Sequence, residues 1–214
     1  MLFKRFLNQI AILIILLSSC SKTKVFTEND IQIIPKPKEL KITKGFFEFS
    51  KNTKFVANND SQKEILNTLI DKFNIAAGWN LEIVTEVPQK NYIKFSIDPN
   101  LTNEGYLLHV TKDNIVIKAK GNIGFLYGLE SLRQLLPTDI ESSTLVKGIE
   151  WRVPNLLIQD EPRFEWRGLM LDVSRHFFEL DYLKETIDAM AMLKLNVLHL
   201  HLIDHHAYIS CSIA

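Results

Sequence analysis

Between residues 54 and 119, short runs that alternate apolar and polar residues predict a β-sheet with one face in water. These runs have the length of strands and are rich in β-branched and aromatic residues. They cover residues 54–57, 81–85, 92–97, 105–110 and 114–119. The segment Lys112-Asp-Asn114 predicts a hairpin turn between the last two runs. Because His109 lies within an alternating run, we expect it to have a structural or surface role.

Two longer segments repeat their apolar residues with the period of a helix. The apolar positions are Ile65, Leu69, Phe73 and Ala76 in the first segment, and Phe125, Leu129, Leu132 and Leu136 in the second. Pro137 ends the second helix, because proline cannot continue the hydrogen-bond ladder. Strands and helices together predict an α+β N-terminal domain over residues 31–160, with two helices on one face of a mostly antiparallel sheet.

Residues 161–204 have a different organisation, namely a strand, a helix and a second strand. A linker at Asp160-Glu-Pro162 precedes a strand of buried character that ends at Asp172. Apolar residues between 183 and 191 mark one face of a helix, and residues 195–203 form a second, nearly continuous apolar strand. A helical crossover of this kind joins parallel strands, so we expect a βαβ unit.

Polar side chains gather where the two strands of this unit end. They are Asp172, Arg175, His176 and Asp204. Parallel α/β folds place their functional sites at the carboxyl ends of the strands, which makes these residues the candidates for a site. The alternative is structural: Arg175 and one of the two acids would form an ion pair at a strand end.

The histidines of the second strand raise a further alternative, a metal site. His199 and His201 are two residues apart in a strand, so both rings point to one face, and Asp204, His205 and His206 follow directly. Several barrel metallohydrolases use this geometry.

Composition describes an ordinary globular protein. The 214 residues are 46% hydrophobic and 23% charged, and their formal net charge is zero. With no net charge and no basic stripe, a nucleic-acid partner is not expected.

Residues 1–19 have the layout of a secretory signal peptide. Lys4 and Arg5 precede an apolar run at residues 10–17, and small serines follow it. The run is too short to span a bilayer as a helix, and the alternatives are a buried helix or a signal anchor.

Leu17-Ser-Ser-Cys20 resembles the bacterial lipobox, in which the cysteine is diacylated and becomes the new N-terminus. The resemblance implies an exported bacterial lipoprotein, held to a membrane by its lipid anchor, in the periplasm or at the cell envelope surface. The polar residues 20–30 would then be a tether. With Cys20 lipidated, only Cys211 remains, so no intramolecular disulfide is expected.

Two segments resemble glycoside hydrolase family 20, the family of β-N-acetylhexosaminidases. Residues 33–38 and 104–137 look like its N-terminal accessory domain. The run RGLMLDVSRHFFELDYLKETIDAMAMLKLNVLHLHLID, from Arg167 to Asp204, closely resembles the opening of its catalytic (β/α)₈ barrel.

The resemblance implies a reaction and roles for three residues. The family removes terminal non-reducing N-acetylhexosamine from glycans with retention, and the substrate's own acetamido oxygen is the nucleophile. Arg175 would grip hydroxyls of the terminal sugar, and Asp204 would help to organise the sugar pocket with His201 just inside it. The catalytic Asp-Glu pair belongs to a later barrel strand, so no catalytic residue is assigned here. Neither a cofactor nor a metal is expected.

The same comparison indicates that the barrel is incomplete. Residues 161–204 would be its first β-α-β, whereas a whole barrel takes about 250 residues. Residues 205–214 depart from the family pattern and look like an aberrant tail after a frameshift or truncation, with the missing remainder of the barrel encoded separately. We expect little or no activity from this chain alone. The alternative is a non-catalytic envelope lipoprotein or a glycan-binding remnant.

Overall fold

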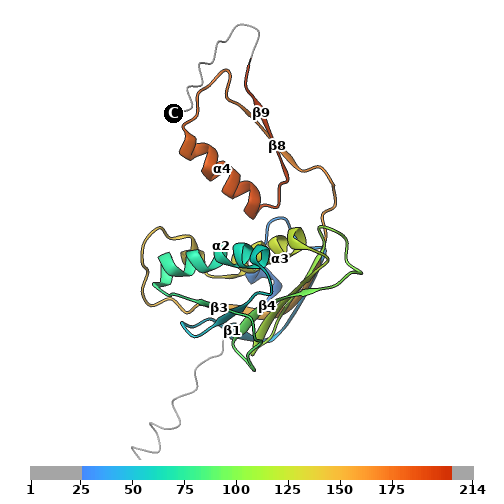
Figure 1. Ribbon diagram of the computed structural model, residues 1–214, viewed down its shortest axis with the longest axis vertical. Coiled ribbons are helices and arrows are strands. Elements are labelled where there is room, and N and C mark those ends of the chain that lie inside the picture. The colour runs from blue at the N-terminus through green and yellow to red at the C-terminus, as the bar shows by residue number, and fades with distance from the viewer. Residues whose placement is uncertain (1–25, 204–214) are drawn as a thin grey trace, which may run out of the picture.

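The computed structural model describes residues 26–203, which form two units. The N-terminal unit, residues 26–161, is a sheet covered by helices, and the C-terminal unit, residues 162–203, extends away from it (Figure 1). The strands of the first unit are β1 (Glu39–Glu48), β2 (Lys54–Val56), β3 (Glu82–Val84), β4 (Tyr92–Ile97), β5 (Tyr106–Val110), β6 (Asn114–Ala119) and β7 (Arg152–Asp160). Its helices are η1 (Glu28–Asp30), α2 (Asp60–Ala77), α3 (Asn122–Leu135) and η2 (Thr138–Glu141).

The sheet of the N-terminal unit is mixed, so the prediction of a mostly antiparallel sheet is wrong. Its seven strands have the order β1-β7-β5-β6-β4-β2-β3. The pairs β1–β7, β7–β5 and β5–β6 are antiparallel, whereas β6–β4, β4–β2 and β2–β3 are parallel. For the β2–β3 pair the physical reason lies in the connection, because α2 crosses over between these two strands and a helical crossover returns the chain in the same direction.

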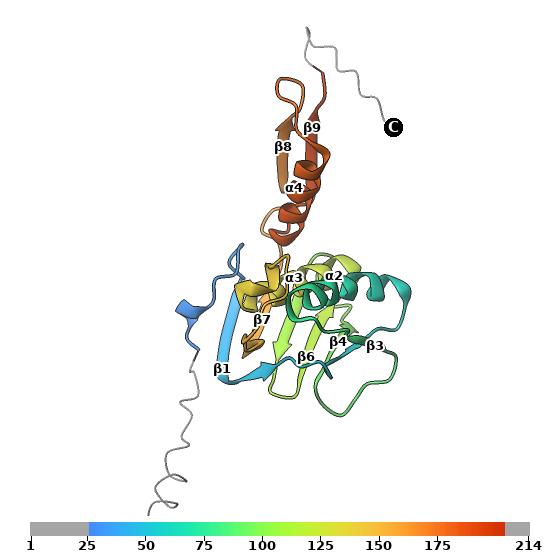
Figure 2. The same ribbon diagram turned by 90° about the vertical axis from the view of Figure 1, so that its left-hand side faces the viewer.

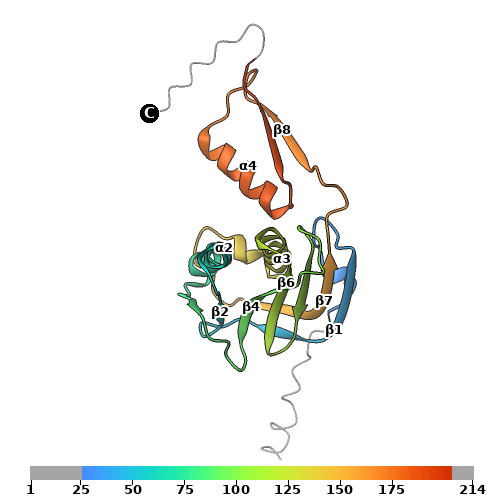
Figure 3. The same cartoon turned by 45° about the vertical axis from the view of Figure 1, so that its right-hand side comes forward.

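Both predicted helices form and lie side by side over one face of this sheet (Figure 3). Helix α2 begins where the Asn59 side chain accepts a hydrogen bond from the amide of Gln62 at 2.9 Å, and it ends at Gly78 in the left-handed conformation. Helix α3 ends just before Pro137, as predicted. Between the helices and the sheet lies the apolar core, whose fully buried side chains include Phe55, Leu66, Phe73, Leu108, Ile117, Phe125 and Leu129.

Local predictions for the strands also hold. Thr111 and Asn114 close the predicted hairpin turn between β5 and β6, with the amide of Thr111 2.9 Å from the carbonyl oxygen of Asn114. His109 lies in β5 with its side chain exposed, which agrees with a surface role.

The C-terminal unit is a parallel pair of strands joined by one helix (Figure 2). It consists of β8 (Gly168–Asp172), α4 (Leu180–Met192) and β9 (Val197–His201). This is the predicted βαβ order, although both strands are shorter than the apolar runs that contain them. From residue 161 to residue 203, only Met190 and Lys194 are buried. The unit therefore has almost no core of its own among the described residues.

Candidate functional site

The candidate site lies where β8 and β9 end. Asp172 is the last residue of β8, His201 is the last of β9, and the two face each other in the strand register. One carboxylate oxygen of Asp172 lies 3.3 Å from Nδ1 of His201. The two parallel strands thus bring an acid and an imidazole into contact at their carboxyl ends, the edge that the sequence indicates.

Asp172 also fixes the turn that follows β8. Its Oδ1 accepts hydrogen bonds from the amides of Ser174 at 3.1 Å and Arg175 at 3.0 Å. The backbone donor of Arg175, then the His201 side chain and the Arg175 charge, hold the pKa of Asp172 below its ordinary value. Asp172 is therefore an anion at neutral pH.

Arg175 forms an ion pair with this anion. Its Nε lies 3.2 Å from Oδ2 of Asp172, so the structural alternative considered for Arg175 describes a real contact. The Arg175 side chain is nevertheless 71% exposed, while that of Asp172 is 24% exposed. A guanidinium is a planar fork of several donors, a geometry that suits oxygen-rich ligands at the strand ends.

The other predicted site residues divide into two groups. His176 packs edge-on against the ring of Phe178, with centroids 5.1 Å apart, and takes no part in the contact between Asp172 and His201. Asp204, His205 and His206 lie outside the described residues, as do Cys20 and Cys211. Within residues 26–203, no three His, Cys, Asp or Glu side chains come close enough together to hold a metal ion.

A cleft of about 650 Å³ lies elsewhere, at the junction of the two units, and neither Asp172 nor His201 lines it. Its walls include Pro35, Tyr106, Asp160, Arg167 and Lys194. Sequence reasoning singled out neither Arg167 nor Lys194, since each lies before a strand rather than after it. The one signal in the sequence that could have pointed to them is that each is a cation placed just before an apolar run.

Two family models match this chain in succession. The model described as glycosyl hydrolase family 20, domain 2, matches residues 30–161, and the one described as glycosyl hydrolase family 20, catalytic domain, matches residues 164–211. The chain belongs to glycoside hydrolase family 20. The resemblance inferred from the two sequence segments is thereby confirmed.

Curated members of this family show the same relationship. The beta-hexosaminidase of Porphyromonas gingivalis is 38% identical over 184 residues, which cover 85% of this chain and 24% of that protein. The beta-N-acetylhexosaminidase of Cellulomonas fimi is 34% identical over 184 residues, covering 84% of this chain and 36% of that protein. This chain thus spans about a quarter to a third of the length of these family 20 relatives.

Solved family 20 structures share the fold. The β-N-acetylhexosaminidase of Streptomyces coelicolor A3(2) superposes with a TM-score of 0.75 at 30% identity, over 83% of this chain and 35% of that one. A mutant Streptomyces plicatus β-hexosaminidase in complex with GlcNAc gives a TM-score of 0.76 at 30% identity, over 86% of this chain and 36% of that one. Between residues 26 and 203, none of the helices has both the length and the apolar content needed to cross a membrane.

Proposed function

We propose that this chain supplies the first part of the sugar pocket of a β-N-acetylhexosaminidase that removes terminal N-acetylhexosamine from glycans. One observation carries the proposal. Within the segment that matches the family's catalytic domain, Asp172, Arg175 and His201 meet at the carboxyl ends of two parallel strands. Parallel barrels bind their substrates at this edge.

Each group has a task in this proposal. The exposed guanidinium of Arg175 presents several donors in one plane, which suits neighbouring sugar hydroxyls. Asp172 holds Arg175 and His201 in place, and its charge compensates the arginine. Asp204 follows β9 and would complete this side of the pocket. Strands β8 and β9 would be the first two strands of a (β/α)₈ barrel, and their parallel pairing with a helical connection supports this.

Binding of the monosaccharide N-acetylglucosamine tests the proposal directly. We expect saturation-transfer NMR to show contact between the protein and the acetyl methyl group of N-acetylglucosamine, with a weaker response for glucose. Arg175→Ala should abolish the response, because the donor fork is lost. Arg163→Ala is the matched control, since Arg163 is also exposed but lies in the linker, where it lines the cleft and packs over the ring of Phe164. Loss of binding with Arg163→Ala alone would move the site to the cleft and contradict the proposal.

Hydrolysis is a separate question from binding. The Asp-Glu pair that the family uses lies on a later barrel strand, so we expect the 214-residue chain to leave a chromogenic N-acetyl-β-glucosaminide intact. Joined to the remaining strands of a family 20 barrel, it should cleave that substrate but spare the β-glucoside, which lacks the acetamido nucleophile. Equal cleavage of both substrates by the joined protein would exclude the proposed reaction.

We also propose that the protein is exported and lipidated at Cys20, which would hold it at a membrane of the cell envelope. The lipobox-like segment before Cys20 supports this. Each buried CH₂ of the acyl chains contributes about 0.8 kcal/mol of membrane affinity. In a bacterial host, Cys20→Ala should release the protein from the membrane fraction, whereas the control Cys211→Ala should remain there. Equal membrane retention of both variants would argue against a lipid at Cys20.

A further inference from the structure

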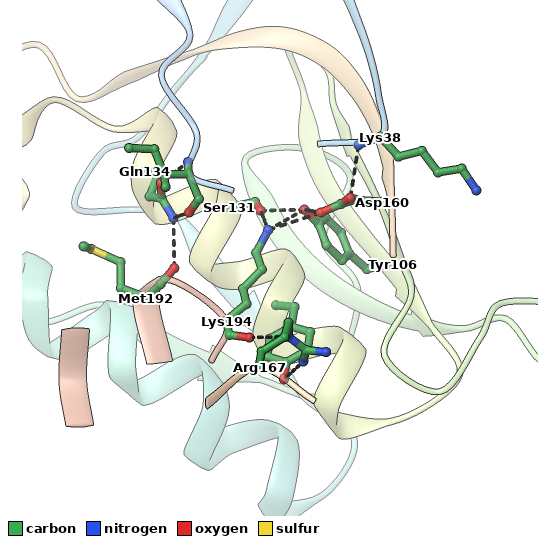
Figure 4. A network of polar contacts seen from close by, with 10 residues as sticks. Lys38, Tyr106, Ser131, Gln134, Asp160, Arg167, Met192 and Lys194 are labelled. Carbon is green, nitrogen blue, oxygen red and sulfur yellow. Dashed lines mark hydrogen bonds and ion pairs between the residues drawn. The ribbon is translucent and has the colours of Figure 1, made fainter. Parts of the chain in front are cut away.

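The junction between the two units is held by polar contacts. Lys194 lies in the turn between α4 and β9, and its side chain is only 5% exposed. A buried ammonium is costly unless acceptors surround it, so the neighbours of this side chain are informative. Figure 4 shows it reaching from the C-terminal unit into the N-terminal unit.

Three acceptors of the N-terminal unit surround the Lys194 ammonium. Its Nζ donates to the hydroxyl of Ser131 at 2.8 Å and to that of Tyr106 at 2.9 Å, and it lies 3.3 Å from the carboxylate of Asp160. These groups also bind one another, because the Tyr106 hydroxyl donates to Asp160 at 2.9 Å. An ammonium has three protons, and here each has an acceptor. Burial lowers the pKa of Lys194, and Asp160 opposes that shift.

Arg167 makes a second connection between the units. Its guanidinium binds both carboxylate oxygens of Glu104, at 2.6 and 3.2 Å, and donates to the hydroxyl of Tyr127 at 2.8 Å. Its Nε donates to the carbonyl oxygen of Lys194 at 2.8 Å, which joins the two connections (Figure 4). Bidentate pairing of this kind fixes orientation as well as distance.

Arg167 and Lys194 both lie at the starting ends of the parallel strands. Arg167 immediately precedes β8, and its carbonyl oxygen accepts from the amides of Asn196 at 2.9 Å and Val197 at 3.3 Å. The amide of Arg167 in turn donates to the Asn196 side chain at 3.0 Å. The first rung of the β8–β9 ladder is therefore built at the same place as the connections to the N-terminal unit.

We propose that Arg167 and Lys194 are positioning residues through which the N-terminal unit sets the register of β8 and β9. The N-terminal unit holds the starting ends of both strands, and the ladder carries this alignment to Asp172 and His201 at the other ends. A one-residue slip in a parallel pair would turn these side chains to opposite faces. The importance of the far ends for sugar binding rests on the proposed function, whereas the alignment itself does not.

Lys194→Met tests the alignment, because methionine keeps the length of the side chain but removes the ammonium. We expect amide exchange in residues 168–172 and 197–201 to accelerate by at least about tenfold, with little change in β5 and β6. The amide resonances of Ser174 and Arg175, at the far end of the ladder, should also shift. Lys184→Met is the matched control, since Lys184 pairs with Asp181 on the exposed side of α4, and it should change neither signal.

Tyr106→Phe provides a second variant in case Lys194→Met does not fold. It removes a single hydroxyl from β5 and leaves both units otherwise intact, so the same two signals should change in the same direction. If either variant alters exchange only in the turn at residues 191–196, Lys194 merely stabilises that turn and the proposal is wrong. Neither measurement involves a sugar, so a failure here is distinguishable from a failure of the proposed function.

Discussion

At the scale of single residues, the Asp172 carboxylate joins Arg175 and His201 at the strand ends. The sequence marked all three as candidates, but it contained no information on strand register, which creates the contact between Asp172 and His201. The pKa of Asp172 is lowered in the folded chain, so the ionised carboxylate stabilises the turn. This stabilisation is complete above the pKa of an ordinary aspartate, about 3.9, and is lost as the pH falls through the lowered pKa. We predict that the amide resonances of Ser174 and Arg175 titrate with a midpoint below this value. In Asp172→Asn the titration should vanish. A midpoint above the ordinary aspartate value in the parent protein would contradict the contact geometry.

At the scale of elements, α3 packs so closely on the sheet that it requires a glycine. A Cβ at position 128 would lie 2.5 Å from Cγ2 of Ile117 in β6, whereas one at Gly121, just before the helix, would meet nothing within 4 Å. A contact of 2.5 Å forces neighbouring atoms to move, so we take the upper part of the usual overpacking cost, about 2–3 kcal/mol, from which alanine returns about 1 kcal/mol of helix propensity. We predict that Gly128→Ala lowers the free energy of unfolding of the N-terminal unit by about 1–2 kcal/mol in urea titrations. Gly121→Ala should stay within about 0.5 kcal/mol of the parent, and equal effects of both would refute this packing.

The same helix shows how far sequence patterns reach. The periodicity of residues 125–136 predicted α3 and its end at Pro137, because both depend on local chemistry. Strand β1 escaped prediction, since its alternation of polar and apolar residues breaks at Lys44 and Gly45, where its register with β7 also shifts. The direction of pairing also escaped, because it depends on how the connections cross the sheet rather than on the strands themselves. Likewise, no pattern in the sequence linked Lys194 to Asp160.

At the scale of the whole molecule, the two units should differ sharply in stability. The N-terminal unit has a continuous buried core, whereas the β8–β9 pair leaves large apolar side chains in solvent: Met170 is 58% exposed and Leu200 is 37% exposed. Local stability follows the apolar contacts that protect backbone hydrogen bonds. We predict that amides of residues 197–201 exchange at least about tenfold faster than those of residues 106–110 in the 214-residue chain. Equal protection in the two strands would show that the polar junction through Arg167 and Lys194 couples the units into one cooperative structure.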